Sequence, residues 1–300
     1  MQDHQYRLLE IQVIEAFEQR QLSIVDREIY KMRINELFNA VVKDKKFQLS
    51  LLEPITISFL WGSMANSKEI PRLYPSFIDR MMDATIGEIV FDSEQLPAIF
   101  NALSKLKYYY PNLFVKKCSS VVVAMEEQLI QQAKNLQADG IAKIIASFVV
   151  LQSSYSASSL NQALEAIFDR ALDPKLKPFF RQAVTLTMLV NGLGRMGMEV
   201  QVNSKCYQLI ELSIELILDI LKSSNSADET QYFTKENTRR VSWALSKWEG
   251  VFYNHEKYQT LISMLNDYGK YHFTQRFFRM NLAEAGDERR INFDATIQNK

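Results

Sequence analysis

The stretch that decides the fold reads Ser-Trp-Ala-Leu-Ser-Lys-Trp at residues 242–248. Its pattern is a small residue, Leu, a small residue, a basic residue and a large apolar residue. The same pattern recurs as Phe-Asn-Ala-Leu-Ser-Lys-Leu at 100–106 and Val-Asn-Gly-Leu-Gly-Arg-Met at 190–196, with weaker copies at 61–66 and 146–151. The small residues at positions 63, 102, 147, 192 and 244 are therefore spaced roughly 40 to 50 residues apart, a period typical of stacked pairs of antiparallel helices.

The segments between these copies also follow the helical period. In residues 205–222, polar residues recur at steps of three or four while apolar residues fill nearly every other position, which predicts a helix buried on most of its circumference. Asp92-Ser93, Asp139-Gly140 and the box at 226–229 are helix start signals. Residues 198–202 alternate like a strand but are too few, and we interpret them as a linker. Second helices of the pairs are expected at 74–82, 111–125, 159–171, 205–221 and 255–265.

We therefore predict an all-α chain built as an α-solenoid of about five helix-turn-helix repeats, each of roughly 40–50 residues. Residues 1–48 would form an N-terminal helical cap, 49–266 the helical-repeat array, and 267–300 a C-terminal tail or capping arm. Small residues in each first helix would let the next helix approach closely. The alternative is an irregular helical bundle in which the repeated pattern arises by chance.

Composition limits the function classes. The 300 residues are 47% hydrophobic and 23% charged, with 35 Lys and Arg balancing 35 Asp and Glu, so the chain is neither disordered nor a strongly basic nucleic-acid-binding domain. Any RNA contact must come from a local patch, and no DNA partner is expected. No apolar run is long enough for a membrane span. Cys118 and Cys206 lie in apolar helical contexts, which predicts free buried thiols in a reducing compartment.

Two of the repeated stretches, 100–106 and 242–248, resemble the first-helix pattern of the octotricopeptide, heptatricopeptide and FAST-kinase-like repeat proteins, roughly Leu-Trp-Ala-Leu-Ala-Lys-Leu-Gly. The Pro-Asn-Leu-Phe at 111–114 resembles the opening of the second helix in those repeats. The resemblance covers about residues 50–265. It implies an α-solenoid of mitochondria or plastids that acts on organellar RNA or as an accessory ribosomal subunit. The chain departs from that family in its neutral charge and in lacking an evident transit peptide or C-terminal RAP-type domain.

Two features make an RNA contact a hypothesis. Lys105, Arg195 and Lys247 occupy one repeat position, so in a stacked array they would form a basic ladder along a phosphate backbone, although Asn66 and Val150 interrupt it. The second feature combines cations with rings on which bases could stack. Its residues are Lys107, Tyr108, Tyr109, Lys116 and Lys117. The alternative for the ladder is a solvated polar face, and the alternative for the tyrosines is that their rings are wedged between helices.

The C-terminal segment leaves the repeat pattern and contains Arg276, Phe277, Phe278 and Arg279. Phenylalanines flanked by arginines are typical of an arm that docks on a partner protein. A capping helix over the last repeat is the alternative interpretation.

One motif matches a cofactor fingerprint. Residues 192–197 read Gly-Leu-Gly-Arg-Met-Gly, the GxGxxG of dinucleotide-binding turns, but they do not lead directly into a helix as such a turn must. We therefore assign these glycines to the repeat pattern and expect no cofactor. Metal-ligand spacings, nucleophile elbows and P-loops are absent from the sequence, so we expect neither a metal site nor an enzyme.

Three hypotheses follow from the sequence. The first is a non-enzymatic helical-repeat scaffold in an organellar ribonucleoprotein, an accessory mitochondrial ribosome subunit or RNA-associated factor, bound to RNA and to proteins of a larger complex. The second is an α-helical protein–protein interaction module without RNA, such as an effector or assembly factor. The third is an enzyme without a recognisable motif. A mitochondrial location is expected for the chain, with the cytoplasm as the alternative.

Overall fold

The computed structural model describes residues 2–20, 23–67, 75–87, 89–114, 119–152, 157–196, 204–222 and 233–272. Within these ranges every regular element is a helix, which confirms the all-α prediction. None of these helices combines the length and the apolar content needed to cross a bilayer. The predicted helix start at 226–229, the linker at 198–202 and Cys118 lie outside the described residues.

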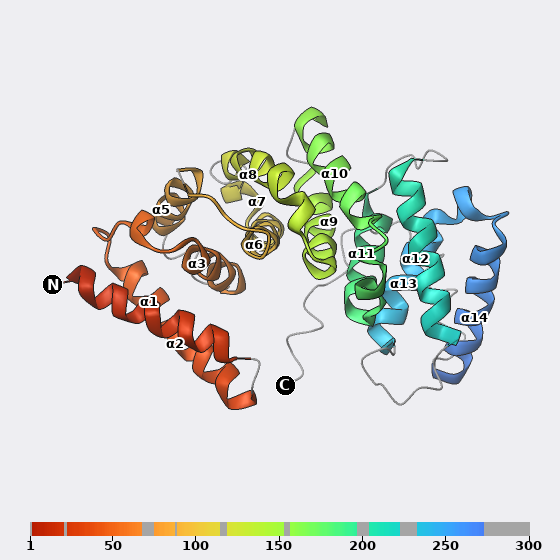
Figure 1. The fold of residues 1–300 in the computed structure, drawn as a ribbon, viewed down its shortest axis with the longest axis horizontal. Helices are drawn as coiled ribbons and strands as arrows, with labels where there is room; N and C mark the ends of the chain where they lie inside the picture. The colour runs from red at the N-terminus through yellow and green to blue at the C-terminus, as the bar shows by residue number, and fades with distance from the viewer. Residues whose placement is uncertain are drawn as a thin grey trace.

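The helices follow one another in an arc from α1 and α2 at one end to α13 and α14 at the other (Figure 1). Short 3-10 turns precede three of them, at Leu49–Leu51, Ala133–Asn135 and Lys177–Arg181. The α-helices are α1 (Gln2–Gln19), α2 (Ile24–Lys43), α3 (Pro54–Asn66), α5 (Pro75–Ile86), α6 (Gln95–Tyr109), α7 (Pro111–Leu113), α8 (Ser119–Gln132), α9 (Ala138–Gln152), α10 (Ala157–Ala171), α11 (Ala183–Arg195), α12 (Lys205–Lys222), α13 (Lys235–Phe252) and α14 (Glu256–His272).

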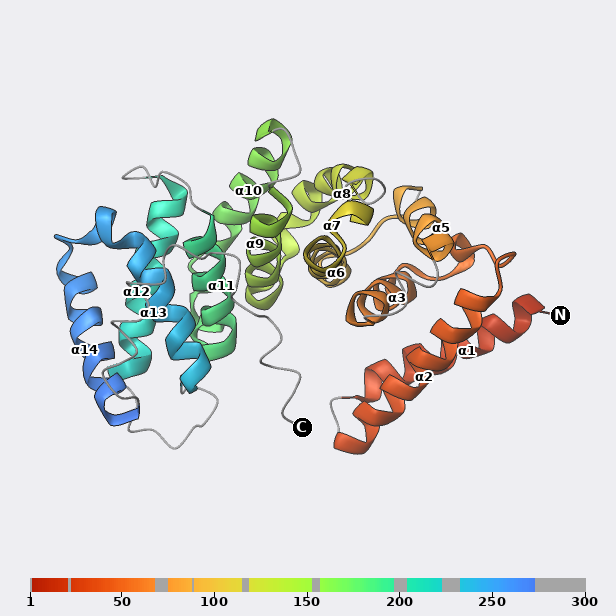
Figure 2. The ribbon, with the colours of Figure 1, turned by 180° about the vertical axis from the view of Figure 1, so that it is seen from behind.

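The helices pack in two rows. Helices α3, α6, α9, α11 and α13 form a first row, in which each helix packs against the next one. Helices α5, α8, α10, α12 and α14 form a second row with the same successive contacts. Both views of the molecule show this order along the chain (Figures 1 and 2). Each repeated stretch of the sequence lies in a helix of the first row.

Helix α12 has the bounds expected from its periodicity, Lys205–Lys222, and its apolar residues are buried along its whole length. Within it, Cys206 is a free, buried thiol, as predicted, and burial raises its pKa to about 11. This cysteine is therefore neutral and unreactive at ordinary pH.

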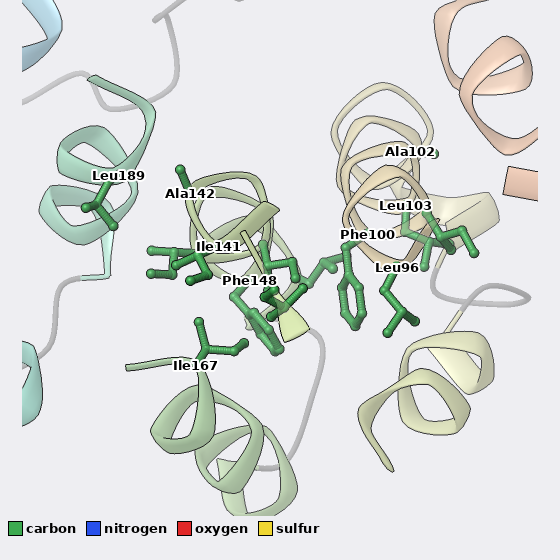
Figure 3. Close-up of a cluster of buried hydrophobic side chains, with 14 of the residues drawn as sticks. Leu96, Phe100, Ala102, Leu103, Ile141, Ala142, Phe148, Ile167 and Leu189 are labelled. Carbon is green, nitrogen blue, oxygen red and sulfur yellow. The ribbon is translucent and has the colours of Figure 1, made fainter. Parts of the chain in front are cut away.

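The core between the rows is apolar and tightly filled. Leu96 and Phe100 of α6 point into the same space as Phe148 of α9 and Ile167 of α10 (Figure 3). The rings of Phe100 and Phe148 are stacked with their centroids 5.3 Å apart, and neither side chain is more than 1% exposed. Full burial of a side chain of this size contributes about 1.5–3 kcal/mol, so this cluster holds α6, α9 and α10 together.

Two glycines set the spacing of the first row. A Cβ at Gly192 of α11 would lie 3.0 Å from the backbone nitrogen of Ala146 in α9, and one at Gly194 would lie 2.9 Å from the Cα of Ala244 in α13. Only glycine leaves room for backbones this close. Both residues lie inside a continuous helix, whereas a dinucleotide fingerprint needs a turn between a strand and a helix. The dinucleotide interpretation is therefore excluded for these two glycines, while Gly197 lies outside the described residues.

Some predicted helix ends are confirmed and others are wrong. The carboxylate of Asp92 accepts hydrogen bonds from the backbone N–H groups of Glu94 and Gln95, at 2.8 and 2.9 Å, and caps the start of α6 as expected. Of the helix expected at 111–125, residues 111–113 form α7 and 119–125 belong to α8, while 115–118 lie outside the described residues. Helix α9 begins at Ala138, before the start signal, so that Asp139 lies in its first turn.

Candidate nucleic-acid interface

The last turns of α3, α6, α9 and α11 meet at one edge of the first row. Lys105 of α6 reaches Asn66, the last residue of α3, and Lys107 of α6 reaches Leu151 in the last turn of α9. Arg195, the last residue of α11, lies close enough to Tyr108 of α6 to interact with it electrostatically. The folding of the row therefore brings the predicted cations of α6 and α11 to the same edge.

Lys105 and Lys107 connect neighbouring helices. The Lys105 amine donates to the Asn66 side-chain oxygen at 2.7 Å, and the Lys107 amine donates to the Leu151 carbonyl at 3.1 Å. That carbonyl belongs to the last turn of a helix, where backbone oxygens lack helical partners and attract cations. Burial lowers the pKa of both lysines, that of Lys107 to about 8. These two lysines are half-buried bridges between helices and do not project into solvent as a ladder would.

Stability at alkaline pH is expected to report on Lys107. The folded chain releases this proton near pH 8, whereas the unfolded chain keeps it up to the ordinary lysine pKa of about 10.5. In this window the unfolded state binds more protons, so raising the pH stabilises the fold. Lys107→Met should remove the rise in the urea-unfolding midpoint that this group contributes between pH 7.5 and 8.8. The raised pKa of Cys206 acts in the opposite direction, but it does so equally in both proteins and cancels from the comparison. Lys134→Met, at an exposed lysine, should leave that rise in place; an unchanged profile in Lys107→Met would contradict the prediction.

A second group of side chains lies where α11 meets α13. The guanidinium carbon of Arg195 is 5.9 Å from the centroid of the Trp243 ring, and the amine of Lys247 is 5.5 Å from it. The edge of this ring rests on α11 at Gly194, where a Cβ would be 3.3 Å from the ring carbon Cζ3. Arg240, one turn before Trp243 on α13, lies close enough to Arg195 to lower its pKa. We refer to Arg195, Arg240, Trp243 and Lys247 as the Trp243 cluster.

Electrostatics in the Trp243 cluster are dominated by positive charge. Burial lowers the pKa of Arg195 most, the like charge of Arg240 lowers it further, and Tyr108 acts in the opposite direction. Arg240 donates to the carboxylate of Glu236 at 2.9 Å, but Arg239 shares the same carboxylate at 3.1 Å. The Glu236 carboxylate therefore accepts from the guanidinium groups of both Arg239 and Arg240.

The predicted tyrosines lie at the end of α6. Tyr108 is 47% exposed, Tyr109 is half-buried, and their rings meet edge to face with centroids 5.1 Å apart. Tyr108 therefore joins the edge that holds Arg195. The other predicted residues, Lys116, Lys117, Arg276, Phe277, Phe278 and Arg279, lie outside the described residues.

Sequence reasoning missed Arg240 and Trp243 as members of the site. Their positions relative to Lys247, at steps of three and four, place all three residues on one face of α13. That helical spacing is the signal in the sequence for this shared face.

Several cations of α12 and of the elements packed against it are matched by carboxylates. Along α12, Glu215 binds both Lys177 and Lys257, Asp219 binds Arg181 at 2.9 Å, and Lys205 binds Glu165 and Asp169 at 3.0 and 2.7 Å. Exposed pairs of this kind contribute at most about 1 kcal/mol each, but they leave little net charge on this face. In the part of the chain that the structure describes, no three His, Cys, Asp or Glu side chains are grouped as metal ligands.

The chain matches no protein-family model, no curated protein and no solved structure.

Proposed function

We propose that the chain is a non-enzymatic α-solenoid that acts as a scaffold in an organellar ribonucleoprotein, such as an accessory subunit of the mitochondrial ribosome. The successive packing of the first-row and second-row helices supports the solenoid, because repeat units of this kind contact only their neighbours. Each unit pairs one helix of the first row with one of the second. The resemblance of residues 100–106 and 242–248 to organellar repeat proteins supports the setting.

The Trp243 cluster is the observation that favours RNA as a ligand. Although the whole chain has no net charge, α13 has four Lys or Arg residues and two Glu, and Arg195 adds another cation beside it. A flat ring among cations is the combination that proteins use to bind a single-stranded phosphate backbone and its bases. A local patch of this kind is sufficient for a subunit whose other contacts are made with proteins.

Charge reversal in the cluster is expected to weaken RNA binding. Binding of a labelled single-stranded RNA would be followed by fluorescence anisotropy at several salt concentrations. Arg240→Glu/Lys247→Glu should reduce affinity at least tenfold and should lower the slope of log affinity against log salt by roughly 1 to 1.5, because two phosphate contacts are lost. Lys134→Glu/Lys175→Glu makes the same change in net charge at two exposed lysines outside the cluster and should bind nearly as well as the native chain.

Equal losses in both double variants would mean that binding depends on net charge alone, and no binding by the native chain would refute the RNA contact.

In cells, the tagged protein should sediment with a heavy particle that ribonuclease disperses. Mass spectrometry of the co-migrating species would identify that particle. A light peak that ignores ribonuclease would refute the ribonucleoprotein role.

A protein–protein interaction module without RNA is the second candidate, and the α1–α2 hairpin favours it. Leu8 and Ile11 of α1 are exposed, as are Val25, Ile29 and Met32 of α2. The three residues of α2 follow helical spacing and lie along one side of it. The end of a repeat array usually has a polar outer face, so exposed apolar residues here favour a protein partner. If this candidate is correct, Ile29→Lys/Met32→Lys should release the chain from its complex while Arg240→Glu/Lys247→Glu should not.

A further inference from the structure

We infer that two copies of this chain pair through the outer side of the α1–α2 hairpin, each copy placing the same surface against the other. The residues that carry this contact are Leu8, Ile11, Val25, Ile29 and Met32, and we refer to them as the hairpin face. The pairing does not depend on RNA, and it names the partner of the surface on which the second candidate function rests.

The hairpin face points away from the rest of the molecule. Phe17 of α1 packs on Phe59 of α3 with ring centroids 4.4 Å apart, so this side of α1 faces the array. Successive residues of a helix turn by about 100°, which places Leu8, nine residues before Phe17, on the opposite side of α1. On α2, Tyr30 packs on the same Phe59 with ring centroids 5.6 Å apart. Met32, two residues later, lies about 160° around the helix from Tyr30 and is therefore also turned away from α3.

The size of the hairpin face matches the apolar share of a dimer interface. Its five side chains are each between 41% and 66% exposed. Together they leave roughly 400 Å² of apolar surface, a size typical of patches that bind a partner. A standard interface buries about 800 Å² on each partner, and a little over half of that area is apolar. A second copy of the same face would therefore cover this surface and leave the remaining area to polar residues at its rim.

The described part of α14, at the opposite end of the array (Figure 1), is polar on its outer side. A polar outer face is what the end of a repeat array requires in water. Docking of the hairpin face of one copy on α14 of the next would bury polar groups against apolar side chains, which costs free energy. Two hairpin faces, by contrast, are apolar on both sides of the contact. The exposed residues within 256–266 of α14 are Glu256, Lys257, Gln259, Thr260 and Ser263.

A two-fold axis between the copies covers both hairpin faces at once. In such a dimer one surface serves both subunits, so the assembly closes at two copies and no filament forms. Charge does not oppose the contact, because residues 2–43 include seven acidic and six basic residues and two such hairpins repel each other little. Since the hairpin lies at one end of the arc (Figures 1 and 2), the dimer would be elongated, with the two α14 helices at its far ends.

Sedimentation equilibrium of the purified full chain, without RNA, tests the pairing. At micromolar concentrations the native chain should have twice the 34.8 kDa mass of one copy. Ile29→Lys/Met32→Lys places two charges from each copy in the apolar contact and should raise the dissociation constant at least a hundredfold, giving monomers. Val123→Lys/Ile130→Lys adds the same charges at two exposed apolar residues of α8 and should remain dimeric. Thermal melting followed by circular dichroism would establish that both variants are folded.

A mixing experiment distinguishes a shared face from a contact with another surface of the second copy. Tagged Ile29→Lys/Met32→Lys should not capture the untagged native chain, because pairing requires the hairpin face on both copies. Capture would mean that the native hairpin face docks elsewhere on the variant, and this result would overturn the inference. A native chain that stays monomeric, or a dimer that survives Ile29→Lys/Met32→Lys, would overturn it as well. None of these outcomes bears on RNA binding by the Trp243 cluster, which is measured separately.

Discussion

Substitution of Gly194 by alanine is expected to destabilise the chain by about 1–3 kcal/mol, although alanine is the better helix former. The added Cβ would lie 2.8 Å from the Cβ and 2.9 Å from the Cα of Ala244. Because a backbone atom cannot rotate away as the end of a long side chain can, α13 as a whole must move from α11. Gly194→Val would add two more carbons at the same point and should cost more.

Gly250 and Gly62 supply matched controls in the same row of helices. A Cβ at either position meets nothing within 4 Å, so alanine there should stabilise the helix by roughly 0.5–1 kcal/mol through its higher helix propensity. Urea unfolding of Gly194→Ala and Gly250→Ala should therefore give midpoints that move in opposite directions. If both variants were stabilised, α11 and α13 would not be in close contact.

Replacement of Trp61 by alanine is expected to have the largest effect of any single truncation, about 3–5 kcal/mol. This ring is fully buried, and its Nε1 donates to the Thr85 hydroxyl at 2.8 Å. That hydroxyl in turn donates to the Met81 carbonyl at 2.6 Å. The side chain thus joins α3 to α5 by packing and by a short chain of hydrogen bonds.

A double-mutant cycle separates the packing from the hydrogen bond. Trp61→Phe removes the donor, and Thr85→Val removes the acceptor but leaves Nε1 buried without a partner, which costs about 1–3 kcal/mol. The double variant should be more stable than the sum of the two single losses indicates, because no orphan donor remains. Additive losses, measured by urea unfolding, would mean that the hydrogen bond contributes nothing.

The sequence allowed the helical class and much of the local structure to be predicted, because both depend on neighbours in the chain. The bounds of α12 follow from its own polar stripe, and Asp92 caps α6 through residues only two and three positions away. Gly192 and Gly194 were correctly attributed to close helix packing. In each case the signal and its consequence lie within a few residues.

The roles of the cations could not be predicted in the same way. The repeat pattern placed Lys105 and Lys107 on α6, but their acceptors are Asn66 and the Leu151 carbonyl, 39 and 44 residues away in the chain. Which helix end lies within reach of a lysine depends on how the rows stack, and this information is absent from a single helix pattern. Trp243 likewise belongs to a repeated stretch, but its packing against Gly194 of α11 is a contact between helices that the repeat pattern does not contain.

The stacking of each helix mainly on its neighbours in the row also has a mechanical consequence. A rotation of a few degrees at one interface disturbs few atoms, yet equal rotations at successive interfaces add along the row, as in a coil spring. The distance between the α1–α2 hairpin and α14 can therefore change by far more than any single contact does. A chain built in this way can change its curvature without breaking its own core.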